Sequence, residues 1–104
     1  MGAHDKHEII HKIKSVTPLL KKMQYPAKRV GLFGSVARGD DTIESDIDIL
    51  IDFGSEDDSA IVRGFIDAKK ILRPVIGMNL HLTDYPLPSG DPPELIWVET
   101  DIDI

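Results

Sequence analysis

One segment near the middle of the chain has two chemically different sides. From Asp46 to Phe53 it begins as an alternation of aspartate and isoleucine and continues as an apolar run. Successive side chains of a β-strand point to opposite faces of a sheet. The segment is therefore predicted to be a strand with one face in a core and carboxylates on the other. The inward set is Ile47, Ile49 and Ile51, and the outward set is Asp46, Asp48 and Leu50.

The rest of the pattern predicts helices and strands around this segment. Apolar residues at helical spacing predict a helical segment within residues 1–27, kinked or split into two short helices at Thr17-Pro18. Residues 28–33 read as a strand, and 35–39 as a single helical turn. Residues 61–72 carry the apolar stripe of another helix.

Prolines mark the later boundaries. Arg73-Pro74 is expected to stop the second long helix, and 75–83 to hold a third strand. Residues 85–93 contain four prolines and predict a connection without regular structure. Residues 94–104 fit either a short helix or an edge strand. We expect one domain over 1–104, made up of a helical segment 1–27, a core 28–83, and a connection with a C-terminal segment 84–104.

Composition narrows the functional classes. The chain has 104 residues, a formal net charge of -6 and no cysteine. A negative average field disfavours nucleic-acid binding, and the lack of cysteine excludes disulfides and thiolate metal sites. No apolar run approaches the ~18 residues of a membrane span. These features predict a cytoplasmic protein without a membrane partner.

The carboxylates suggest a metal site. Asp46 and Asp48 lie two positions apart on a predicted strand, so both can reach one divalent cation. Gly34-Ser35 precedes Asp46 by eleven residues. A glycine lets the backbone approach a phosphate closely, and Ser35 offers a hydroxyl and the amides of a beginning helix. Together the two features predict a site for a nucleotide and a metal ion.

The spacing of these motifs also carries a family resemblance. Gly34-Ser35-Val36-Ala37-Arg38-Gly39, followed by Ser45-Asp46-Ile47-Asp48-Ile49-Leu50-Ile51, resembles the signature of the minimal nucleotidyltransferases of the polymerase-beta-like superfamily. The resemblance implies an α+β fold, a small mixed β-sheet flanked by helices. It also implies binding of a nucleoside triphosphate, by default ATP, with Mg²⁺ in a site for one or two ions, and transfer of a nucleotidyl group.

The resemblance assigns roles to individual residues. Asp46 and Asp48 would be catalytic and would bind the metal, while Gly34 and Ser35 would hold the triphosphate. Arg38 would either contact phosphate or serve as an ion-pair donor to the nearby acidic residues, and the sequence leaves both readings open.

One position departs from the family pattern. The family places a third aspartate on a later strand, and the matching position here is His81. Asp84 lies three residues further on and is expected to face the other side of its strand. A neutral imidazole could accept a proton or bind a softer metal. The alternative is that catalysis was lost with the aspartate.

Three functions follow from the resemblance. In the first, the domain transfers AMP from ATP to a hydroxyl group of a partner protein, as an antitoxin paired with a helical HEPN-type protein. In the second, it is a catalytically degenerate module that neutralises such a partner by binding. In the third, it is a homodimer that modifies a small molecule held between its subunits.

Overall fold

The computed structural model describes residues 2–98, and residues 1 and 99–104 lie outside it. The elements are α1 (Lys6–Lys21), β1 (Arg29–Phe33), α2 (Gly34–Arg38), β2 (Ile47–Asp52), α3 (Asp58–Ile76), β3 (Leu80–Asp84) and β4 (Ile96–Val98). Of the two readings of 94–104, a short strand is therefore correct for 96–98. None of the described helices is long and apolar enough to cross a membrane.

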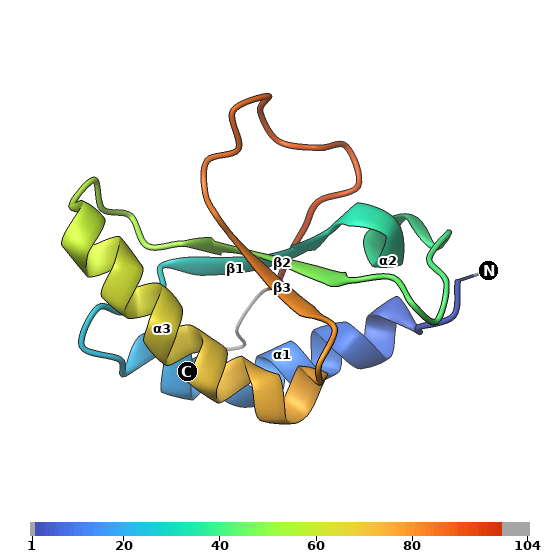
Figure 1. The fold of residues 1–104 in the computed structure, drawn as a ribbon, viewed down its shortest axis with the longest axis horizontal. Helices are drawn as coiled ribbons and strands as arrows, with labels where there is room; N and C mark the ends of the chain where they lie inside the picture. The colour runs from blue at the N-terminus through green and yellow to red at the C-terminus, as the bar shows by residue number, and fades with distance from the viewer. Residues whose placement is uncertain (1, 99–104) are drawn as a thin grey trace, which may run out of the picture.

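The strands form one mixed sheet in the order β3, β2, β1, β4 (Figure 1). Strand β1 is antiparallel to both β2 and β4, and β2 is parallel to β3. The register places Asp48 of β2 between Phe33 of β1 and His81 of β3. A small mixed sheet with flanking helices is the predicted α+β fold, so this prediction is confirmed.

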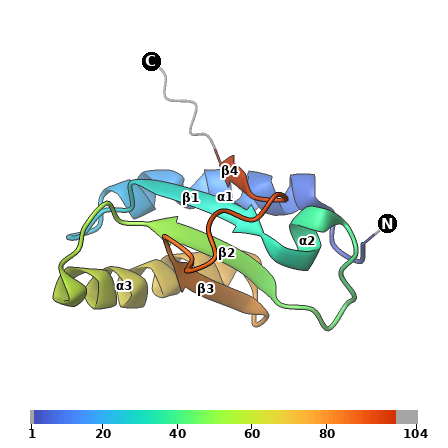
Figure 2. The ribbon, with the colours of Figure 1, turned by 90° about the horizontal axis from the view of Figure 1, so that it is seen from above.

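Helices α1 and α3 lie against one face of the sheet (Figures 1 and 2). Burial of apolar side chains between these layers is the main favourable term in folding. The three inward isoleucines of β2 are almost completely buried, as predicted. They join side chains of both helices in a single core, whose fully buried members include Ile13, Leu20, Leu32, Ile49, Ile51 and Leu72.

Helix α1 runs unbroken through Pro18, so the predicted division into two short helices at Thr17-Pro18 was wrong. A proline inside a helix leaves the carbonyl four residues earlier without its amide partner. Here that carbonyl belongs to Lys14, and the Thr17 hydroxyl donates a hydrogen bond to it at 2.8 Å. The side chain thus replaces the lost backbone bond, which lets the helix continue to Lys21.

Helix α3 also passes a proline. The sequence predicted an end at Arg73-Pro74, whereas the helix ends at Ile76. That prediction was wrong because one missing backbone bond does not outweigh the burial of Ile76 in the core. Gly77 caps the helix: its φ of 109° favours glycine, and its N–H donates a hydrogen bond to the Arg73 carbonyl at 2.9 Å.

The connection between β3 and β4 crosses the other face of the sheet (Figures 1 and 2). It has no helix or strand between residues 85 and 95, as its prolines predicted. Leu50 points to this face and yet is completely buried. Leu95 and Trp97 pack onto Gly31, the residue opposite Leu50 in the register. The middle of this face is therefore covered, whereas Asp48, nearer the end of the face, is partly exposed.

The central strand supplies a test of the core. Leu32 is fully buried, so we expect Leu32→Ala to lower the free energy of unfolding by about 2–5 kcal/mol. Ile43→Ala is the control, because this side chain is 78% exposed and its loss should change stability by less than about 0.5 kcal/mol. Urea unfolding followed by circular dichroism measures both. Equal effects would contradict the assigned core.

Candidate active site

Two carboxylates and an imidazole lie close together beside α2, on the sheet face opposite α1 and α3. Asp46 directly precedes β2, Asp48 is its second residue, and His81 lies opposite Asp48 on β3. One potential ligand atom from each lies within 4.8 Å of the others. The Nδ1 atom of His81 is 3.1 Å from Oδ1 of Asp48. The structure thus brings the three predicted catalytic residues together, while their roles remain predictions.

Asp84 does not join this group. It lies opposite Ile51, an odd number of residues from the Asp48–His81 pair, and therefore faces the helix-covered side. Burial, together with the nearby negative charges of Asp52 and Asp58, raises its pKa. His81 therefore occupies the position expected for the third aspartate, and Asp84 does not replace it.

Burial and a second carboxylate both act on the ionisation of Asp48. Burial raises the pKa of Asp48 above its usual range, and the neighbouring charge of Asp46 adds to this effect. The hydrogen bond from His81 acts in the opposite direction. A positive charge next to Asp48 would stabilise its ionised form and remove the repulsion between the carboxylates.

Gly34 is adapted to this site in two ways. Its φ is 77°, in the left-handed region that other residues rarely adopt. A Cβ atom at this position would also overlap Oδ2 of Asp48. Ser35 follows in α2 and is partly exposed. The predicted phosphate-binding turn therefore lies directly against the predicted metal ligand.

Arg38, at the end of α2, forms two ion pairs. Its Nε is 3.2 Å from Asp40, and its Nη1 is 3.2 Å from Glu94. The hydrogen bond to Asp40 is the main reason that the pKa of Arg38 is raised. The Arg38 side chain is nevertheless about half exposed. The expected ion pair of Arg38 with a nearby acidic residue is therefore present at Asp40, while contact with phosphate remains a prediction.

Glu94 is a residue of the site that the sequence pattern did not predict. It lies in the connection before β4, and its Oε2 accepts a hydrogen bond of 3.0 Å from the Gly34 N–H. The two residues are 60 positions apart. An acidic residue after two prolines has no distinctive pattern, so only the fold reveals this contact.

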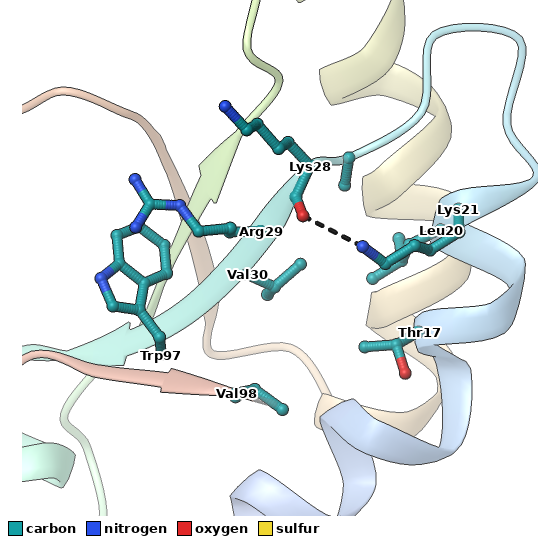
Figure 3. A pocket seen from close by; sticks show the side chains of 9 residues that line it. Thr17, Leu20, Lys21, Lys28, Arg29, Val30, Trp97 and Val98 are labelled. Atoms are coloured by element: carbon teal, nitrogen blue, oxygen red, sulfur yellow. Dashed lines mark hydrogen bonds between the residues drawn. The ribbon is translucent and has the colours of Figure 1, made fainter. Parts of the chain in front are cut away.

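A separate pocket lies away from the carboxylates (Figure 3). It has a volume of about 410 Å³ and opens between the end of α1 and the beginning of β1, whereas the carboxylates lie near the end of β1. Lys21 and Lys28 both line this pocket, and the Lys21 ammonium donates a hydrogen bond to the Lys28 carbonyl at 3.0 Å. None of the predicted site residues lines this pocket.

Comparison with known families identifies the domain. The family described as a nucleotidyltransferase domain matches residues 6–83, which include both helices of the core and strands β1 to β3 up to Thr83. The chain belongs to this nucleotidyltransferase family. The match contains the motifs at Gly34 and Asp46, and it supports transferase activity.

Two similar proteins carry names that include protein adenylyltransferase. A protein of Methanocaldococcus jannaschii, named as a candidate protein adenylyltransferase, is 35% identical over 75 residues, covering 72% of this chain and 70% of its own. The protein adenylyltransferase MntA of Thermococcus cleftensis is 30% identical over 76 residues, covering 70% of this chain and 74% of its own. No solved structure matches the chain significantly.

The donor set of this nucleotidyltransferase fits a divalent cation. Asp46 and Asp48 offer the hard oxygen ligands that Mg²⁺ prefers, and His81 offers a nitrogen that suits Mn²⁺ or Zn²⁺ as well. One ligand atom of each lies within 4.8 Å of the others, and Asp48 and His81 are direct neighbours in the strand register. The contact of Gly34 with Asp48 places the phosphate-binding turn beside these ligands.

Gly34 can be tested against a matched glycine. Gly34→Ala should lower the free energy of unfolding by about 1–3 kcal/mol, because it combines a left-handed backbone with overlap on Asp48. Gly39 has a similar φ of 82°, but a methyl group added there would meet no atom within 4 Å. Gly39→Ala should therefore cost less in thermal or urea unfolding. A smaller cost at Gly34 would show that Asp48 does not restrict this position.

Proposed function

We propose that this nucleotidyltransferase domain transfers AMP from ATP to a hydroxyl group of a protein. The single observation that carries the proposal is that Asp48, which lies beside Asp46 and His81, is also in contact with the turn at Gly34. The protein adenylyltransferase names of the two relatives support a protein as acceptor.

The reaction is a displacement at phosphorus. The acceptor oxygen forms a bond to the α-phosphorus of ATP, the bond to the bridging oxygen of pyrophosphate breaks, and pyrophosphate leaves. Divalent cations held by Asp46 and Asp48 would offset the charge on the phosphates. Nδ1 of His81 faces Asp48, so Nε2 is the atom assigned to receive the hydroxyl proton.

The acceptor is proposed to come from a partner protein. Asp46 and His81 are exposed, and Asp48 is partly exposed. An open site of this kind suits a hydroxyl group carried on another protein surface better than a small molecule, which needs an enclosing pocket. The family resemblance, and not the geometry, implies a HEPN-type helical protein as this partner, which the domain would modify as an antitoxin.

Calorimetric titration of ATP tests the nucleotide site. ATP should bind the wild-type protein in Mg²⁺ but not in EDTA, and Asp48→Asn should abolish the Mg²⁺-dependent binding without a large loss of stability. Glu44→Gln is the control, because this exposed acidic residue is near in sequence and lies outside the site. Label from the α-phosphate of ATP, and not from the γ-phosphate, should then appear on the partner. Binding that is equal in Mg²⁺ and EDTA would contradict the proposal.

His81 favours one alternative, a degenerate module that only binds its partner. His81→Asp separates the two readings, because it adds a carboxylate beside Asp48. With Mg²⁺, the variant should bind ATP more tightly than wild type and transfer AMP faster. Without metal, its melting temperature should fall because the carboxylates repel each other. A wild type and a variant that both bind the partner but transfer no AMP would establish the binding module instead.

A further inference from the structure

The carboxylate of Glu94 occupies hydrogen-bond donors of the proposed triphosphate site. Its Oε2 accepts from the Gly34 N–H at 3.0 Å and lies 3.2 Å from Nη1 of Arg38. The Glu94 side chain is only 13% exposed, whereas Arg38 is 48% exposed. A nearly buried carboxylate thus bridges two donors that are close in space and belong to the predicted nucleotide-binding residues.

A carboxylate and a phosphate compete for such donors. Both are anions that accept charge-assisted hydrogen bonds from an amide N–H and a guanidinium. One amide hydrogen cannot make a full bond to two anions, and two anions at the same place repel each other. A phosphate oxygen can therefore take the Gly34 amide only when Glu94 leaves it.

We propose that the Glu94 carboxylate competes with phosphate for the Gly34 amide and the Arg38 guanidinium, and that ATP binds by displacing this carboxylate. The identification of ATP as the displacing anion rests on the proposed function, whereas the competition itself rests on the contacts of Glu94. Affinity for the nucleotide is then set partly by the cost of releasing this internal anion.

The surroundings of Glu94 permit this exchange. Arg38 keeps its contact with Asp40 through Nε when Glu94 leaves Nη1, so the guanidinium stays in place with one edge free. Leu95 packs onto Gly31, and β4 pairs with β1, which hold the backbone on the far side of Glu94. The movement therefore needs only the Glu94 side chain and the irregular connection before it.

The experiment compares wild type with Glu94→Gln and Glu94→Ala. Glutamine keeps the shape and an acceptor for the Gly34 amide but removes the charge, while alanine removes both. Glu56→Gln is the matched control, because it removes the same charge from an exposed loop position. Each protein is titrated with tripolyphosphate in EDTA and with ATP in Mg²⁺, and its melting temperature is measured without ligand.

Both Glu94 variants should bind tripolyphosphate about tenfold more tightly than wild type, since a charge-assisted contact no longer has to be broken. Both Glu94 variants should also bind ATP in Mg²⁺ more tightly than wild type. Glu56→Gln should bind both ligands as wild type does. A gain for tripolyphosphate without Mg²⁺-dependent ATP binding would support the competition and contradict the proposed function.

Two results would overturn the inference. If ATP binds wild type and both Glu94 variants equally, or binds the variants more weakly, Glu94 does not compete, although the nucleotide site itself stands. If no protein in the series binds either anion, both the competition and the nucleotide site are wrong. A loss of melting temperature in Glu94→Ala alone does not affect the comparison, because Glu94→Gln preserves the side-chain shape.

Discussion

The pairing register between β1 and β2 determines the geometry of the whole site. Phe33 lies opposite Asp48, so the chain turns into α2 directly beside this carboxylate, and Gly34 has room for no side chain. The parallel pairing of β2 with β3 places His81 on the other flank of Asp48. A slip of one residue would send the aspartates into the core and the isoleucines into solvent. Packing of the isoleucines therefore also fixes the position of the carboxylates.

The local parts of this arrangement could be predicted from the sequence. The alternation in β2 identifies its two faces, and the Gly-Ser turn at Gly34 predicts the short helix α2. His81, and not Asp84, was expected beside Asp48, and the register places it there. The two faces of β2 and the exclusion of Asp84 depend on the two-residue period of a strand, which a sequence displays directly. The choice of His81 depended on the spacing of the family resemblance. The roles assigned to the site residues remain predictions.

The features that the sequence did not predict depend on contacts that only the folded chain shows. Proline rules predicted breaks in both long helices, and they failed because the Thr17 hydroxyl replaces one backbone bond and the core retains Ile76. Glu94 reaches Gly34 across 60 residues, and no local pattern marks it. The buried carboxylate of Asp41, which holds His4 at 2.7 Å, is another example. Such contacts become visible only when the sheet order is known.

Arg29 connects both ends of the segment that carries Glu94. Its guanidinium lies over the ring of Trp97, 3.9 Å from the centroid, and 5.1 Å from the centroid of Tyr85, and it also pairs with Asp52. The two rings contact each other edge to face. The Arg29 guanidinium thus holds both ends of the β3–β4 connection, through Tyr85 at its beginning and Trp97 after its end. Because these contacts involve only the two ends of the connection, the release of Glu94 proposed above would leave the anchoring of the connection to the sheet intact.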